Sequence, residues 1–221
     1  ARARLELGRY ERAFAEGEPD AQAHLRAAIP HLGAGAILLP PVRVDYGENI
    51  VVGEGSFANY GLTALDVATI TIGVHCQFGP NVQLLTPIHP LEPTPRRAGL
   101  ESADPIVIGD NVWLGGGVIV CPGVTIGDDC VIGAGAVVTR DIPARSLAVA
   151  SPARYRSCIE FSPFVGYNRP SLELSAVVQE LLPGIQVPGH PGRAGSCPVI
   201  WISWPRAGYR SRVSSRAASG P

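Results

Sequence analysis

The chain has 221 residues, a length that allows one domain or two. Its 18 basic residues, all Arg, stand against 19 acidic ones, and this net charge of −1 argues against a nucleic-acid binder, which needs clustered positive charge. No run approaches the eighteen apolar residues of a membrane helix, and no signal peptide is recognisable. We therefore expect a cytoplasmic protein without nucleic-acid or membrane partners, and the lack of any Met predicts a fragment or a processed form.

The five cysteines predict neither a disulfide framework nor a structural zinc site, because their number is odd and no CxxC pair occurs. Residues 1–35 are predicted to form an N-terminal helical segment, since they are rich in Ala, Leu, Glu and Arg. The break at 17–20 divides this segment into two helices. Asp20 is the expected cap of the second helix, and Pro30 follows its end.

From about residue 36 the sequence repeats with a period of six. One apolar set recurs at every sixth position, and a second apolar set lies two residues before it. Strands have a period of two and helices one of 3.6, so neither explains six. A chain wound round a triangular prism does, because three hexapeptides make one coil that pairs with the next as a parallel sheet. The first set is Ile72, Phe78, Leu84, Ile108, Leu114, Val120, Ile126, Ile132 and Val138.

The period is interrupted in two places. The repeat starts near Val52, and two extra residues before Ile72 predict a bulge at 66–68. Residues 85–105 are rich in Pro and break the pattern, which then resumes in phase. We expect this segment to project from the prism, where a long excursion from a rigid scaffold commonly carries function.

The repeat ends near Arg154. Residues 158–221 lack periodicity and are predicted to be an irregular, weakly ordered tail without a catalytic role. Within that tail, Ser171–Leu182 is the one stretch with a helical pattern.

The repeat and three motifs together resemble a known family. The motifs are "FAN" at 57–59, "HPL" at 89–91 and "NVWLGGG" at 111–117, and at these spacings they are more specific than the hexapeptide alone, which nucleotidyltransferases and gamma-class carbonic anhydrases share. Residues 1–156 resemble the maltose, galactoside and nodulation-type O-acetyltransferases. This resemblance implies an all-β fold, a left-handed parallel β-helix over residues 36–157. It also implies a homotrimer that binds acetyl-CoA between subunits.

The resemblance assigns catalysis to two residues. His89, in "TPIHPLEP", matches the family's general base, and an imidazole suits that role because it titrates near neutrality. Asn59, in "FANYG", matches the residue that the family places beside the base, where an amide can bond the acceptor or the developing oxyanion. The alternatives are a solvated loop histidine and a turn asparagine. His75 is expected to be structural, and with two histidines in the repeats we expect no metal site.

Asp45 and Asp66 are candidates to bind acceptor hydroxyls, because carboxylates accept such bonds well. Asn59 joins them as a substrate-binding candidate. The chain departs from the galactoside enzyme at Val67, where that enzyme carries its second acidic acceptor residue. The family's N-terminal acidic contact would precede Ala1. The identity of the acceptor therefore stays open.

The resemblance also implies a set of cofactor-binding residues. Trp113 is a candidate wall for the cofactor arm or an aromatic at a subunit contact, and the glycines at 115–117 expose backbone or make a tight corner. Arg140 and Arg154 are candidates for the nucleotide phosphates. Ser157 stands where a family Arg is common, and Arg156 is the nearest substitute. The full set is Asn59, Trp113, Gly116, Ala134, Thr139, Arg140 and Arg154.

The sequence thus predicts an acetyl-CoA-dependent O-acetyltransferase that acts on a sugar or a similar small acceptor by direct transfer. Two alternatives stay open. The first is a xenobiotic acetyltransferase of the streptogramin or chloramphenicol type, which uses the same solenoid and a loop histidine. The second is a degenerate solenoid that binds a partner without catalysis.

Overall fold

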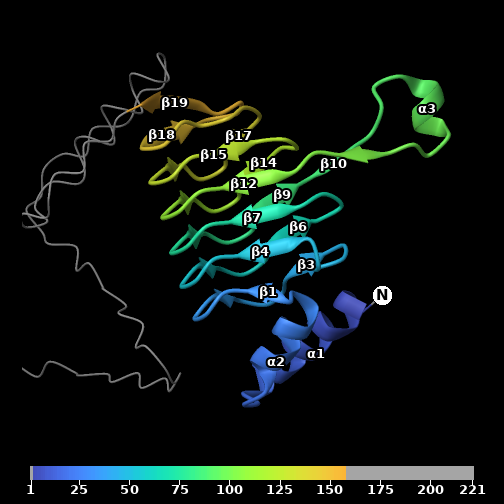
Figure 1. The fold of residues 1–221 in the computed structure, drawn as a ribbon, viewed down its shortest axis with the longest axis vertical. Coiled ribbons are helices and arrows are strands. Elements are labelled where there is room, and N and C mark those ends of the chain that lie inside the picture. The colour runs from blue at the N-terminus through green and yellow to red at the C-terminus, as the bar shows by residue number, and fades with distance from the viewer. Residues whose placement is uncertain (1, 158–221) are drawn as a thin grey trace, which may run out of the picture. The chain divides into compact units, whose positions relative to one another are not determined.

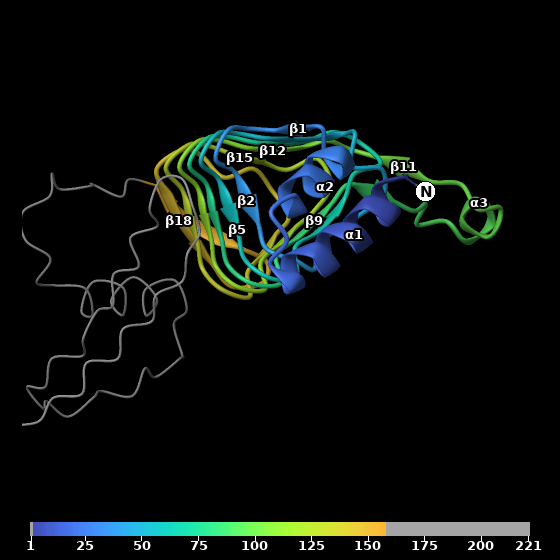
Figure 2. The same ribbon diagram turned by 90° about the horizontal axis from the view of Figure 1, so that it is seen from below.

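The computed structural model describes residues 2–157, which form a three-sided prism of mostly parallel strands with two helices at one end (Figure 1). The chain visits the three faces in turn, and Figure 2 shows the prism along its axis. The predicted helix at Ser171–Leu182 lies outside the described residues.

Each face is one sheet whose strands stack along the prism axis. Face 1 holds β1 (His31–Leu32), β4 (Ile50–Val52), β7 (Ile70–Ile72), β12 (Ile106–Ile108) and β15 (Thr125–Ile126). Face 2 holds β2 (Ile37–Leu38), β5 (Phe57–Ala58), β8 (Gln77–Phe78), β13 (Trp113–Leu114), β16 (Val131–Ile132), β18 (Ser146–Val149) and β19 (Arg154–Ser157). Face 3 holds β3 (Arg43–Val44), β6 (Thr63–Leu65), β9 (Gln83–Leu85), β14 (Ile119–Val120) and β17 (Val137–Val138).

The core of the prism is the predicted six-residue repeat. All nine members of the first apolar set are at most 3% exposed, and the set two residues earlier is buried as well. Each coil therefore contributes apolar side chains to a continuous interior column, and each fully buried aliphatic side chain contributes about 1.5–3 kcal/mol. The corners need a left-handed residue, which explains the positive φ of His75 (57°), Asn81 (59°) and Asn111 (54°).

The first coil is longer and begins earlier than predicted. β1 starts at His31, inside the segment expected to be helical, and β1 pairs with β4 in a register offset of twenty residues. β4 and β7 keep that offset, whereas β12 and β15 are eighteen residues apart. The two extra residues of each early coil lie between face 3 and face 1, at 45–49 and 66–69. The predicted bulge is therefore one of two, and the excursion leaves from the same corner.

Two helices close one end of the prism: α1 (Arg2–Glu16) and α2 (Ala21–Ala28). Tyr10 of α1 is fully buried, and its hydroxyl donates to the Leu38 carbonyl at 2.7 Å. Asp20 stands at the start of α2 but makes no capping hydrogen bond with its side chain, because its backbone (φ −94°, ψ 3°) is not in the extended region that a cap needs.

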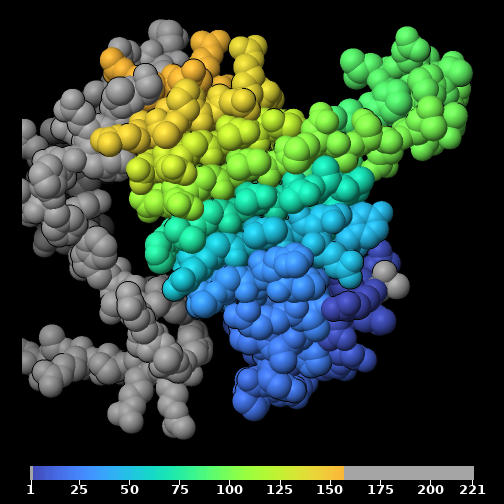
Figure 3. Space-filling view, viewed as in Figure 1, coloured from blue at the N-terminus to red at the C-terminus, as the bar shows by residue number. Residues whose placement is uncertain are grey.

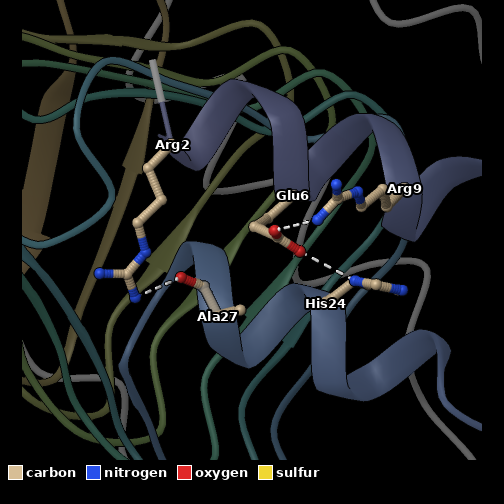
Figure 4. Close-up of polar contacts among 5 residues, drawn as sticks. All are labelled: Arg2, Glu6, Arg9, His24 and Ala27. Atoms are coloured by element: carbon tan, nitrogen blue, oxygen red, sulfur yellow. Dashed lines mark hydrogen bonds and ion pairs between the residues drawn. The ribbon is translucent and has the colours of Figure 1, made fainter.

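Polar contacts join the two helices to each other (Figure 4). The Glu6 carboxylate receives Arg9 Nη1 at 2.7 Å and lies 2.8 Å from His24 Nδ1, and Arg2 donates to the Ala27 carbonyl. The hydrogen bond from His24 is the main cause that lowers the pKa of Glu6. Within residues 2–157, no helix has the length and apolar character needed to cross a membrane.

Candidate active site

The excursion is an ordered arm rather than an irregular loop. Its base is an antiparallel pair, β10 (Pro87–Ile88) with β11 (Ser102–Ala103), and its tip carries α3 (Pro93–Arg97). The arm projects from the prism between faces 3 and 1, as Figures 1 and 3 show. We call this edge of the prism, with segments 45–49, 66–69, 86–105 and 139–141, the arm corner.

His89 follows β10 directly and faces a carboxylate. Because Ile88 pairs with Ser102, the next residues outward are His89 and Glu101. His89 Nε2 lies 3.8 Å from Glu101 Oε2, and the two side chains are 59% and 38% exposed. A base at the surface can meet a small acceptor, and a neighbouring carboxylate stabilises the imidazolium that forms when the base takes a proton. The sequence reasoning missed Glu101, since only the hairpin register places it opposite His89.

Asp45 lies at the same corner, one coil below the bulge at 66–69. It follows β3 and is exposed. Burial of part of the carboxylate, followed by the negative charges of Asp66 and Glu101, raises the pKa of Asp45, while Arg4 opposes the shift. The negative charge of Glu101 therefore acts on Asp45. The structure brings Asp45, Glu101 and His89 to one corner.

Asp66, a predicted acceptor ligand, has a different position. Its side chain is 0% exposed, and its carboxylate accepts four backbone N–H bonds at 2.7–3.2 Å. These donors belong to Asp45, Tyr46, Gly47 and Asn49. The prediction that Asp66 contacts acceptor hydroxyls is wrong, because its oxygens are already occupied and inaccessible. The neighbouring Val67 is exposed, so the chain presents an apolar side chain there.

A cleft of about 370 Å³ lies between α1 and β3, next to Asp45. Val44 forms part of its wall and is followed in the chain by Asp45. Arg43 spans the cleft toward Glu11, with Nη1 to Oε2 at 3.5 Å. The cleft is lined by Arg4, Leu7, Gly8, Glu11, Val42, Arg43 and Val44.

Asn59 lies at another corner of the prism, between faces 2 and 3. It follows β5, its backbone N–H donates to the Phe78 carbonyl, and its Oδ1 accepts from the Tyr60 N–H at 2.8 Å. The amide NH₂ is the end that can donate to a substrate oxygen. β6 separates this corner from the arm corner, and strand geometry makes that span on the order of 15 Å. The structure of one chain therefore does not bring Asn59 and His89 together.

The corner that carries Asn59 is a column of small residues, which we call the glycine corner. Gly79, Gly115 and Gly133 follow Asn59 in successive coils, through bonds such as Gly79 N to Leu114 O and Gly115 N to Ile132 O. A Cβ on Gly115 would lie 2.5 Å from Ala134 N, so close packing requires glycine there. Gly116 and Ala134 belong to this column, and Ala134 is exposed.

The remaining cofactor candidates lie on other parts of the prism. Trp113 is 55% exposed on face 2, between Gln77 and Val131 of the neighbouring strands. Arg154 is exposed on β19, at the edge of face 2. Thr139 and Arg140 are exposed at the arm corner. The predicted site residues thus lie at two different corners of the prism and on face 2 between them.

Three of the five cysteines lie in the described part of the chain. Burial raises the thiol pKa of Cys76, Cys121 and Cys130, whereas a nucleophilic cysteine needs a lowered pKa. Residues 2–157 contain no group of three His, Cys, Asp or Glu side chains that could hold a metal ion. His75, expected to be structural, sits in a left-handed corner position.

Comparison with known proteins places the sequence among hexapeptide transferases. Residues 105–140 match the family described as bacterial transferase hexapeptide (six repeats). Nodulation protein L of Rhizobium meliloti is 45% identical over 150 residues, which are 68% of this chain and 82% of that protein. A protein of Schizosaccharomyces pombe is 60% identical over 115 residues, and the chain spans 56% of that relative's length.

Solved structures agree with the sequence comparison. A maltose O-acetyltransferase from Clostridium difficile 630 superposes with a TM-score of 0.69 at 42% identity, covering 72% of this chain and 84% of that one. A galactoside acetyltransferase in complex with coenzyme A gives a TM-score of 0.62 at 35% identity, covering 76% and 88%. The fold and repeat define a protein of the hexapeptide-repeat class, and the expected left-handed parallel β-helix is confirmed. Within that class, the chain belongs to the maltose, galactoside and nodulation acetyltransferase family.

Proposed function

We propose that this protein transfers an acetyl group from acetyl-CoA to a hydroxyl of a sugar or a similar small acceptor. The observation that carries this proposal is the pairing of His89 with Glu101, at a corner where Asp45 presents a second carboxylate. The relatives support the acetyl donor, since the galactoside acetyltransferase was solved with coenzyme A. A cytoplasmic location, where acetyl-CoA is available to an enzyme, belongs to the same proposal.

The reaction runs by direct transfer. His89 takes the proton of the acceptor hydroxyl as the oxygen attacks the thioester carbonyl, and Glu101 stabilises the resulting imidazolium. The amide NH₂ of Asn59 donates to the oxyanion of the tetrahedral intermediate. Collapse of the intermediate expels the CoA thiolate, which takes the proton back from His89. Asp45 accepts a hydrogen bond from another acceptor hydroxyl and orients the sugar.

A complete site in this proposal is built from two copies of the chain. His89, Glu101 and Asp45 come from the arm corner of one copy, and Asn59 comes from the glycine corner of its neighbour. A heterologous contact between two different corners closes into a ring, and a three-sided prism suits threefold symmetry. The proposed assembly is therefore a homotrimer with three equivalent sites.

The same contact provides a surface for acetyl-CoA. The small residues Gly116 and Ala134 let a pantetheine arm approach the backbone, and Trp113 offers an apolar wall beside them. Arg140 and Arg154 are exposed and can pair with the nucleotide phosphates. Thr139, next to Arg140, is proposed to contact the same end of the cofactor.

The direct test is acetyl-CoA turnover across a panel of acceptors. The panel holds glucose, maltose, a galactoside, chloramphenicol and a streptogramin, and free thiol is measured as CoA is released. Turnover with one or more sugars supports the proposal. Turnover confined to the antibiotics identifies a xenobiotic acetyltransferase instead, and absence of both turnover and CoA binding identifies a solenoid without catalysis.

A further inference from the structure

The arm corner contains two buried polar side chains that the reaction does not use. Asp66 and Thr86 are each 0% exposed, and they are two of the four buried polar or charged residues in the described part of the chain. They occupy the bulge of one coil and the base of the arm on the next. Burying a polar group is costly unless its bonds are satisfied, so their partners show what they hold in place.

Thr86 connects the arm to the coil below it. Its Oγ1 donates to the Leu65 carbonyl at 2.6 Å and accepts from the Ala68 N–H at 3.0 Å. Its carbonyl accepts from the Asp104 N–H at 3.1 Å, on the returning side of the arm. Thr86 therefore fixes both sides of the arm's base against the 66–69 bulge, three residues before His89.

Asp66 continues this connection downward. Its carboxylate binds the N–H groups of the 45–49 turn, and its own carbonyl accepts from Asn49 Nδ2 at 2.8 Å. The first of those N–H groups belongs to Asp45, the proposed acceptor ligand. Two sets of hydrogen bonds, joined by the backbone of residues 65–68, thus connect the turn that carries Asp45 to the base of the arm.

We infer that Thr86 and Asp66 are positioning residues, which set the height and direction of His89 relative to Asp45. This inference deepens the proposed function and rests on it. The physical reason is that His89 and Asp45 would move independently if only exposed segments held them. The buried hydrogen bonds of Asp66 and Thr86, which we call the buried column, favour one arrangement of the two segments. A displacement of about 1 Å at a reacting centre can cost about 100-fold in rate.

The sharpest test compares two hydroxyls with the same bonding in different places. Ser56 is 3% exposed, and its Oγ donates to the Gly73 carbonyl at 2.8 Å and accepts from the Cys76 N–H at 2.9 Å. It joins neighbouring coils at the corner between faces 1 and 2, away from the arm. Thr86→Val and Ser56→Ala each remove one bridging hydroxyl, so each destabilises the fold by a similar amount.

We expect Thr86→Val to lower kcat/KM for the acceptor by about tenfold or more and Ser56→Ala to leave it within about twofold. Thr86→Ser keeps the hydroxyl and restores the rate. Affinity for CoA, measured by titration calorimetry, stays unchanged in all three. In a His89→Ala background, Thr86→Val adds less than about twofold, because it acts through His89. Equal losses in the two hydroxyl variants, or an additive loss in the His89→Ala background, would overturn the inference.

Amide hydrogen exchange separates this inference from the proposed function. Thr86→Val retains the Thr86 carbonyl and the Asp66 carboxylate, so the N–H groups of Asp104 and Asp45 keep their acceptor atoms. A coupled column predicts that both amides exchange at least about tenfold faster in Thr86→Val but not in Ser56→Ala. Unchanged exchange at both amides would contradict the coupling of Thr86 to Asp66, even if acetyl transfer is found. Faster exchange in a protein without acetyl transfer would instead support the coupling of Thr86 to Asp66 and contradict the proposed function.

Discussion

Glu101 Oε2 lies 3.8 Å from His89 Nε2 because β10 and β11 pair in the register that sets Ile88 opposite Ser102. The two residues are twelve positions apart in the chain, and α3 with its flanking turns fills the interval. The arm therefore does more than expose a histidine. It places the Glu101 carboxylate opposite that histidine, on the returning strand of the same arm.

Replacing Glu101 with Gln should lower kcat by about tenfold, because the neutral amide no longer stabilises the imidazolium formed during transfer. The KM for acetyl-CoA should change little. Glu92→Gln is the matched control, since Glu92 is an exposed carboxylate of the same arm, directly before α3. Steady-state kinetics of both variants checks this, and equal rates in Glu101→Gln and Glu92→Gln would show that the carboxylate has no role in the chemistry.

Asp45→Asn should separate activity from stability. Burial and the neighbouring carboxylates raise the pKa of Asp45 in the folded state, so the charged form is disfavoured there relative to the unfolded chain. Its contribution to stability is present at low pH and is lost as pH rises through the folded pKa. At pH 7 the Asn variant should thus show an equal or higher Tm. Its acceptor KM should rise about tenfold. A lower Tm with an unchanged KM contradicts both expectations.

The buried Tyr10 side chain should make the stability of the protein fall at alkaline pH. Burial raises the pKa of Tyr10 to about 12, whereas an unfolded tyrosine ionises near pH 10. Stability should therefore fall between about pH 10 and pH 12, where only the unfolded chain loses this proton. Tyr10→Phe removes that dependence and costs about 1–3 kcal/mol at pH 7, since the Leu38 carbonyl loses its donor. Urea unfolding of both proteins at pH 7 and at higher pH measures the two effects.

Mixed oligomers test whether each site uses two chains. His89→Ala and Asn59→Ala proteins should each be nearly inactive, whereas co-expressed chains should recover activity. In a random trimer about a quarter of the contacts would combine an intact His89 with an intact Asn59. Sedimentation should show the trimer in every sample. Recovery near a quarter of the wild-type rate is expected, and a mixed trimer without recovery would place both residues in one chain's site.

The six-residue period predicted most of the prism, because each buried position must be apolar in every coil. Val52, Ile72 and Val120 follow the rule with no long-range information. The first coil escaped prediction because two extra residues at 45–49 shift its positions out of phase with the later repeat. Periodicity detects regular coils and loses those with an insertion.

The site was predicted less completely than the fold. His89 and Asn59 were predicted as site residues from motifs, but a motif does not tell which corner of the prism a residue occupies. Asp66 was misassigned because an acidic residue in a turn has the same sequence signature whether it binds a substrate or backbone N–H groups. Glu101 carried no sequence signal, since its importance depends on the pairing of β10 with β11.

The measurement that tests the account most directly is the pH dependence of kcat/KM for the acceptor in wild-type and His89→Ala protein. With His89 as the general base, wild-type kcat/KM rises with pH as the imidazole loses its proton, and the variant is slower by about 10²- to 10⁴-fold with no such rise. Binding of CoA to the variant should match the wild type. A His89→Ala protein that keeps most of its rate and the same rising limb would assign the proton transfer to another group and contradict the proposed mechanism.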